Sequence, residues 1–575
     1  MKKLSMRIAA TILTLLLCLS VFAGCTQVSD DTTGTENGSA SKKDPLDKSE
    51  YYEVILFTTD PKIAEYQSQN YFDNLVKEKF NFGVEYVNYP GDPLEKLALM
   101  LSAGDYTDLV ITKTEKYLKA YVDAGALIEL DPLIEKYGEN IKKTHKERIP
   151  YWRAQSGLND GKLWYWTFTE PSYSYGVSSA LNEWKIRSDI LEQQEYPEVR
   201  NEDDVFALVK QGVKDNPTTN GEPTAGFGTP LRDPNSIECA TYFFDAGRLS
   251  HMTYKNGSMW DTEKGEFIDA VTDYSFKDGL LFYNRMWREG LVDRDVITYS
   301  SSEFQNKMST GYGLCTYFYG WNWQNWNENL GKLGHEFRYV PIPSQFKQMQ
   351  EKGHKKIYPI TNGEIWSSYS ITTNAKYPER IMEVADWMMS EEGLIAAGWG
   401  EKGVQYTINS DGLRIPTAEH MQKMQTDENY KYTCTAYSSL GLFGGLDSNG
   451  QNYRMSADST YVDQMVDPKV YDVYSHYGWM NIYEAHNKNK NFESDYAYPV
   501  GFTMIMPNYS DEQNKNWERI DTITVDYTIK LITAESLEQF NTLYEELIQN
   551  RKDLGIDEMI KLRNETYDEL MKGVK

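Results

Sequence analysis

Short apolar runs that alternate with helix-spaced segments constrain the fold of this chain most. Tyr52–Thr58 and Val84–Val87 have the apolar, β-branched and aromatic character of strands, and Leu109–Thr112 is a third such run. Between them, Tyr71–Phe80 and Leu94–Leu101 carry apolar side chains at helical spacing. Strands that alternate with helices of about 10–15 residues indicate βαβ units and a parallel sheet. The sequence therefore predicts an α/β fold.

The remainder of the chain adds helices without any internal repeat. They are expected at Phe276–Arg288, Pro378–Met389, Leu537–Asn550 and Asp557–Met571. Ser536 and Gln539 have the spacing of a capping box for the third of these helices. A chain of 575 residues is long enough for three to four domains or two large lobes.

The balance of charge excludes one large class of partners. The chain has 59 basic and 85 acidic residues, which gives a net charge of −26. A field of that sign repels phosphate backbones, so we expect no nucleic-acid partner. Apolar residues make up 40% and aromatic residues 14% of the chain, enough to build a folded core.

The first 25 residues have the pattern of an export signal. Met1–Arg7 carries three positive charges, and the apolar run Ile8–Ala23 is short for a membrane span. Phe22-Ala23-Gly24-Cys25 resembles a bacterial lipobox, in which the signal is removed and the cysteine is acylated. The polar stretch 26–49 is typical of a flexible tether. We expect a lipid anchor at Cys25, with an ordinary secretory signal as the alternative.

The other cysteines indicate neither a zinc site nor a disulfide framework. Cys18 lies in the signal, which leaves Cys239, Cys315 and Cys434 in the body of the protein. Three widely spaced thiols allow at most one disulfide, and packing in the core is their expected role.

Five segments, taken in order, resemble a known family. They are GDPLEKLALMLSAGDYTDLVI (91–111), YVDAGALIELDPLIEKYGENIKK (121–143), KDGLLFYNRMWREGLVDRDVIT (277–298), YPERIMEVADWMMSEEGLIAAGWGEKGVQYT (377–407) and IDEMIKLRNETYDELMKG (556–573). The chain is similar to family 1 extracellular solute-binding proteins, the large sugar-binding lipoproteins of ABC importers in Gram-positive bacteria. Because the segments span nearly the whole chain after the tether, the resemblance concerns the entire body.

The resemblance implies a two-lobed type II binding-protein fold, α/β in each lobe, with a mostly parallel sheet flanked by helices and with hinge crossings between the lobes. It also implies a monomer that holds a carbohydrate between its lobes and passes it to the permease subunits of an ABC transporter in the cytoplasmic membrane. The expected segments are a signal at 1–24, a tether at 25–49, an N-terminal lobe at 50–170 and 371–470, and a C-terminal lobe at 171–370 and 471–575.

Two other functions stay open at this point. An extracellular carbohydrate-active enzyme would need two carboxylates that meet in space. The chain contains no HExxH, GxSxG, phosphate-loop or CxxC motif, so we expect no catalysis. A peptide receptor on the same fold would favour strand edges that pair with backbone over aromatic platforms.

One loop is a weak candidate for calcium. Large members of the family often carry an acidic, amide-rich loop, and the matching stretch here holds Asp215, Asn216, Asn220 and Glu222. Calcium prefers carboxylates at alternate positions, where this chain has Thr218 and Thr224. We therefore expect a plain turn and no cofactor.

Aromatic side chains among amides and acids supply the candidate ligand site. A sugar ring offers an apolar face that stacks on indole and hydroxyls that need polar partners. Trp321 and Trp323 alternate with amides after a strand-like run, where a loop is expected, and Trp387 is assigned instead to the core. The predicted ligand-binding residues are Trp321, Trp323, Trp366, Trp166, Tyr175 and, at the end of the first strand, Asp60.

Overall fold

The computed structural model describes most of the chain after the tether. It covers residues 44–572 apart from 113–114, 147, 156–157, 159, 168–182, 230–257, 262, 319–322, 360–367, 437–444, 498–506 and 508. Pro45–Lys575 forms one compact unit. In the part of the chain so described, no helix has the length and apolar character needed to cross a membrane.

The first core is built from two stretches that are far apart in the sequence. Its buried side chains come from residues 52–166 and 369–397. Its elements are β1 (Tyr52–Thr58), α2 (Pro61–Tyr66), α3 (Tyr71–Phe80), β2 (Phe82–Asn88), α4 (Pro93–Ala103), β3 (Leu109–Ile111), α5 (Glu115–Asp123), α6 (Asp131–Tyr137), α7 (Glu139–Thr144), α8 (Ile149–Gln155), β4 (Trp166–Thr167), β14 (Ser368–Ile371), α16 (Pro378–Met388) and α17 (Glu391–Trp399).

The second core is likewise discontinuous, with buried side chains from residues 184–346 and 470–547. Its elements are β5 (Glu183–Arg187), α9 (Ser188–Gln193), α10 (Glu202–Asp215), β8 (Ala225–Phe227), α12 (Tyr274–Arg288), α13 (Ser301–Ser309), β11 (Gly313–Phe318), α14 (Trp323–Lys332), β12 (Tyr339–Ile342), α21 (Pro468–His476), α22 (Ile482–Lys488), α23 (Asp511–Ile532) and α24 (Leu537–Asp553). Two cores of this kind make a two-lobed α/β protein, as predicted. The lobe boundaries themselves stay a proposal.

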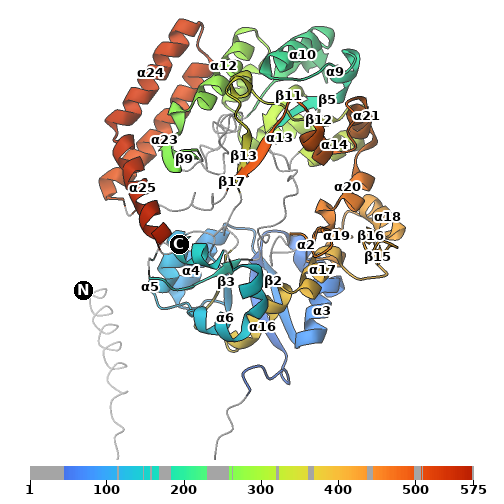
Figure 1. Cartoon of the computed structure of the whole chain (residues 1–575), viewed down its shortest axis with the longest axis vertical. Helices are drawn as coiled ribbons and strands as arrows, with labels where there is room; N and C mark the ends of the chain where they lie inside the picture. The colour runs from blue at the N-terminus through green and yellow to red at the C-terminus, as the bar shows by residue number, and fades with distance from the viewer. Residues whose placement is uncertain are drawn as a thin grey trace, which may run out of the picture. The chain divides into compact units, whose positions relative to one another are not determined.

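Two smaller clusters complete the body. The first joins α25 (Ile556–Lys572) to the hairpin of β9 (Ser258–Asp261) and β10 (Glu266–Asp269), and it includes Tyr151 from α8. Figure 1 shows α23, α24 and α25 side by side. The second cluster lies among α17, β15 (Tyr406–Ile408), β16 (Arg414–Pro416), α18 (Ala418–Thr426) and α20 (Ser459–Met465). The remaining described strands and α-helices are β6 (Thr218–Thr219), β7 (Glu222–Pro223), α15 (Lys347–Glu351), β13 (Lys356–Pro359), β17 (Ser494–Ala497) and α19 (Lys431–Cys434).

The sheets are mixed rather than mostly parallel. β1 and β2 pair in parallel, but β14 runs antiparallel to both β3 and β4. In the second lobe the strand order is β12-β5-β11-β8, and β5 runs antiparallel to both of its neighbours. In the sequence, β4 ends just before the predicted lobe boundary at residue 170, and β14 spans the one at residue 370. The alternation of strands and helices in the sequence did not reveal these antiparallel pairs, because they join strands far apart along the chain.

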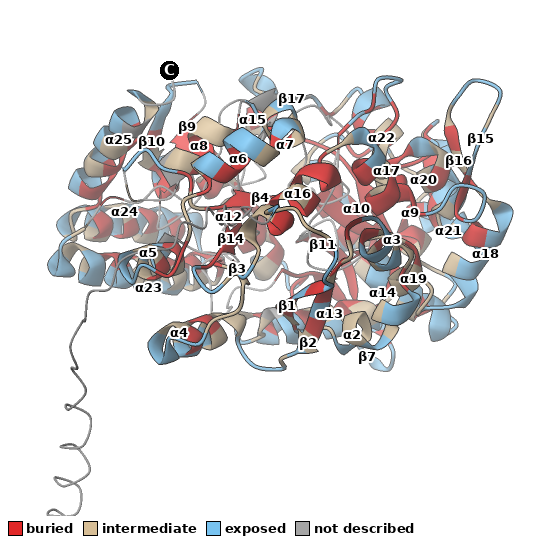
Figure 2. Ribbon diagram, turned by 90° about the horizontal axis from the view of Figure 1, so that it is seen from below, coloured by how far each residue is buried: buried red, intermediate tan, exposed pale blue. Residues whose placement is uncertain are grey.

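Local sequence explains where several elements start and stop. β1 and α3 have the predicted bounds, and α4 ends at Gly104, whose φ of 66° is a left-handed conformation that suits glycine. α16 is buried along most of its length, as Figure 2 shows, and packs against α6 and α7. The capping box before α24 is only half formed. The Ser536 hydroxyl accepts a hydrogen bond from the Gln539 backbone N–H (3.1 Å). The Gln539 side-chain oxygen accepts one from the Glu535 backbone N–H, whereas a complete box would use that of Ser536.

Candidate functional site

Asp60 lies just beyond the carboxyl end of β1, where the sequence placed it. Its side chain caps α2 by accepting a hydrogen bond from the Lys62 backbone N–H (2.9 Å), and its other oxygen accepts one from the Tyr432 hydroxyl (2.9 Å). The Tyr432 ring stacks on Tyr66 with the centroids 6.1 Å apart. A carboxylate beside stacked aromatic rings is a surface suited to sugar hydroxyls. Both oxygens of Asp60 already have partners within the protein.

Trp166 is a core residue rather than an open platform. It lies in β4, is 1% exposed, and stacks on Tyr369 of β14 with the centroids 5.7 Å apart. Its ring therefore helps to hold together the two strands that adjoin the predicted crossings.

Trp323 lies in a helix, where the sequence predicted a loop. It is the first residue of α14, is 9% exposed, and belongs to the core of the second lobe. Trp323, Trp326 and Leu330 recur at helical spacing and share the buried face. Asn327 lies on the same face and pairs with the backbone of Tyr339 through both its oxygen and its nitrogen. The amides between the tryptophans belong to an amphipathic helix. The other candidates, Trp321, Trp366 and Tyr175, lie outside the described residues.

The calcium candidate is a β-hairpin. β6 and β7 pair antiparallel, and the turn between them is Asn220-Gly221, with φ of 54° and 85°. Asn220 donates to the Thr310 carbonyl (2.8 Å), and Asn216 donates to Gln193 (2.8 Å). Asp215 accepts from Gln211, and Glu222 is exposed in β7. No cluster of three or more His, Cys, Asp or Glu side chains fit to hold a metal occurs among the described residues.

Three of the remaining side chains that the sequence singled out lie in the cores. Cys315 and Cys434 are buried free thiols, as expected of core residues, whereas Cys239 lies outside the described residues. Trp387 is 8% exposed and belongs to the core of the first lobe.

A buried charged cluster in the second lobe was missed by the sequence analysis. The Glu183 carboxylate forms an ion pair with the His486 imidazole, and both side chains are almost fully buried. Burial is the largest influence and opposes ionisation of Glu183, but the charge of His486, a hydrogen bond with it and the charges of Lys185 and Lys356 together outweigh burial and hold the pKa of that carboxyl below its usual value. Nearby, the Lys356 ammonium donates to the Tyr317 hydroxyl (3.0 Å).

The cluster lies beside the end of strand β11. Glu183 pairs in register with Phe318, the last residue of β11, after which the chain continues to Trp321. Polar groups therefore gather at the carboxyl end of β11, the edge at which α/β proteins bind ligands. The signal in the sequence was Glu183 and Lys185, two residues apart in a strand whose other side chains are large and mostly apolar.

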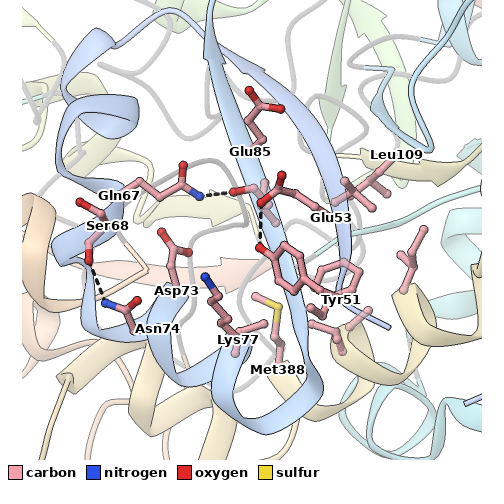
Figure 3. Close-up of a pocket in the computed structure, with 18 of the residues that line it drawn as sticks. Tyr51, Glu53, Gln67, Ser68, Asp73, Asn74, Lys77, Glu85, Leu109 and Met388 are labelled. Carbon is pink, nitrogen blue, oxygen red and sulfur yellow. Dashed lines mark hydrogen bonds between the residues drawn. The ribbon is translucent and has the colours of Figure 1, made fainter. Parts of the chain in front are cut away.

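A cavity of about 290 Å³ lies in the first lobe, away from the carboxyl ends of the strands (Figure 3). It is lined from β1, β2, α3 and the turn Gln67–Gln69, and Trp166 and Met388 also reach it. Its polar lining includes Glu53, Asp73 and Glu85.

Comparison with known proteins decides the family. The family model of bacterial extracellular solute-binding proteins matches residues 64–395, more than half of the chain. This chain is a bacterial extracellular solute-binding protein. The match runs from α2 into α17 and so includes the predicted crossings near residues 170 and 370.

This solute-binding protein is similar in sequence to one curated relative and in fold to two solved structures. It is 22% identical over 229 residues to the fructooligosaccharide ABC transporter substrate-binding protein FusA of Streptococcus pneumoniae, and the match spans 38% of this chain and 41% of that relative. Its fold resembles that of the alginate-binding protein AlgQ2 (TM-score 0.57, 16% identity, 90% of this chain, 98% of that one). It also resembles an HMO-binding, ABC-transporter-associated solute-binding protein from Bifidobacterium longum infantis (TM-score 0.60, 14% identity, 90% and 99%).

Proposed function

We propose that this solute-binding protein captures an oligosaccharide between its lobes and delivers it to the permease of an ABC transporter. One observation carries the proposal: across 90% of its length the chain has the fold of proteins named for binding alginate and HMO. The curated relative, named for fructooligosaccharides, supports the same class of ligand. Binding would proceed by closure of the lobes over the sugar, driven by contacts that only the closed state offers.

The polar and aromatic groups at the strand ends fit this ligand class. Asp60 with Tyr432 in the first lobe, and the Glu183 cluster in the second, offer acids, a cation and hydroxyls beside large rings. Trp321, Trp366 and Tyr175 remain our proposed stacking residues. Trp166 and Trp323 are buried in the cores, which favours a structural role for both. The proposal requires no cofactor.

We further propose that Cys25 carries the lipid that holds the protein on the outer face of the cytoplasmic membrane of a Gram-positive bacterium. The basic and apolar signal, the small residues before Cys25 and the polar tether support this anchor. The protein would act as a monomer, with the permease subunits as its partners.

A ligand screen tests the proposal against its alternatives. The purified protein is heated with neutral fructans, uronic oligosaccharides, N-glycans and milk oligosaccharides, and with a library of short peptides. At saturating concentration a specific sugar raises the melting temperature, because it binds only the folded state. Stabilisation by peptides and by no sugar would assign the protein to the peptide receptors.

A further inference from the structure

The cavity in the first lobe combines an apolar floor with an acidic rim. The floor is made of apolar side chains from the strands, from α3 and from α16, which are Val54, Val76, Val84, Leu109, Ile381, Val384 and Met388. The rim is polar and carries Glu53, Asp73 and Glu85. Lys77 is the only basic residue among the described residues that line the cavity.

The Gln67 side chain occupies part of the free edge of β2, and the cavity lies beside it. Gln67 donates to the Val84 carbonyl and accepts from the Tyr86 backbone N–H. Its amide thus pairs with the free edge of β2 much as a neighbouring strand would. The rest of the gap between β2 and α3 is the cavity (Figure 3).

Asp73 points into this gap instead of capping its own helix. It is the third residue of α3, from which an acid can reach back to the backbone N–H of the N-cap residue. That N–H, on Asn70, already donates to the Gln67 carbonyl (2.9 Å). Figure 3 shows the Asp73 carboxylate directed from α3 towards β2. No described group donates a hydrogen bond to it, and burial alone raises its pKa to about 7.

The other charged groups of the rim do not neutralise Asp73. The Lys77 ammonium lies over the Tyr51 ring, 5.1 Å from its centroid, and forms no ion pair with Asp73. The Tyr51 hydroxyl donates to Glu53 (2.7 Å), which satisfies one oxygen of that acid. Glu85 is exposed at the mouth. The described lining therefore holds three acids and one lysine, and it can carry a net negative charge.

We propose that this cavity binds an alkylammonium group, with the charged amine at Asp73 and the short hydrocarbon chain on the apolar floor. A cation at Asp73 donates the hydrogen bonds that the carboxylate lacks. Its positive charge also favours the ionised carboxylate, which burial disfavours. A volume of about 290 Å³ accommodates a chain of a few methylene groups. The group is carried either by a free diamine or by a lysine side chain.

The proposed amine site is separate from the proposed sugar site. Tyr51, Glu53 and Gly83 belong to the starts of β1 and β2 or directly precede them, whereas Asp60 follows the end of β1. Binding of an amine and binding of a sugar can therefore be measured independently on the same protein.

Calorimetric titration with defined probes tests the site. The full-length protein is titrated with cadaverine, with its neutral isostere 1,5-pentanediol, and with the blocked tripeptide acetyl-Gly-Lys-Gly-amide. Because a net charge of −26 attracts any amine weakly, the control is Glu78→Gln, an exposed acid on the same helix that does not line the cavity. Asp73→Asn and Glu85→Gln are the test variants, and Lys77→Gln removes the one basic residue of the described lining.

The expected result is saturable binding of cadaverine, the lysine peptide or both, and none of the diol. Asp73→Asn weakens binding about tenfold or more, Glu85→Gln weakens it less, Lys77→Gln tightens it, and Glu78→Gln leaves it unchanged. Binding of cadaverine alone assigns a free amine, and binding of the peptide alone assigns a lysine side chain. The proposal is overturned by absence of binding up to about 10 mM, by equal binding of the diol, or by equal affinities of Asp73→Asn and Glu78→Gln.

Discussion

Asp73 couples the stability of the protein to pH. Burial raises its pKa from 3.8 to about 7, so the folded state keeps a proton that the unfolded chain loses. Stability contributed by this group is therefore present below about pH 4 and is lost as the pH rises towards about 7. Glu53 and Glu85 from the strands and Lys77 from α3 face the same space. We expect Asp73→Asn to reduce the fall in melting temperature between pH 4.5 and pH 7.5. Equal slopes in the two proteins would remove Asp73 from this account.

The two tryptophans that the sequence grouped together should behave differently. Trp323 is buried in the second core, so Trp323→Ala is expected to cost about 3–5 kcal/mol of stability and to leave sugar affinity unchanged in the folded fraction. Trp321→Ala is expected to cost about 2 kcal/mol of binding, some thirtyfold in Kd, with little change in melting temperature. Melting curves without ligand, measured beside titrations with the best sugar, separate the two effects. Early melting of Trp321→Ala with normal binding would make that indole structural as well.

At the level of elements, the N-cap of α24 offers a direct comparison. The Ser536 hydroxyl accepts a hydrogen bond from the Gln539 backbone N–H, whereas the Gln539 side chain accepts one from the Glu535 backbone N–H. Ser536→Ala is therefore expected to lower the free energy of unfolding by about 1 kcal/mol. Gln539→Ala, which leaves the serine bond in place, should cost clearly less. Urea denaturation measures both, and an equal loss would indicate a complete capping box in solution.

Elements with local signals could be predicted from the sequence, and those set by tertiary contacts could not. β1 and α3 were found from their apolar spacing, and α4 from the glycine that ends it. The direction of β14 depends on partners more than 200 residues away, at β3 and β4. The start of α14 was misread because aromatic residues among amides fit a ligand loop as well as one face of a helix.

The candidate site shows the same limit. Asp60 could be placed at a strand end because β1 was recognisable, but its bond to Tyr432 joins positions 372 residues apart. His486 stood alone in the sequence, and only the fold brings it to Glu183. Asp73 looked like an ordinary acid in the first turn of a helix, because its environment depends on Gln67 and on the edge of β2.

On the scale of the whole molecule, Cys25 should decide where the protein resides. If its thiol carries the lipid, Cys25→Ala releases the protein into the medium or leaves the signal uncut. Cell fractionation without detergent, followed by immunoblotting of wild type and variant, measures this. A Cys18→Ala variant is the control, because that cysteine lies within the signal. Unchanged membrane retention of Cys25→Ala would contradict the anchor.

The central claim is that the protein binds an oligosaccharide and leaves it chemically intact. Titration calorimetry with the best sugar of the screen, followed by chromatography of the recovered ligand, tests it most directly. We expect saturable binding of one sugar per protein and full recovery of the unchanged oligosaccharide after hours of incubation. Shortened products that disappear on substitution of a single Asp or Glu, or the absence of any saccharide binding, would contradict the account.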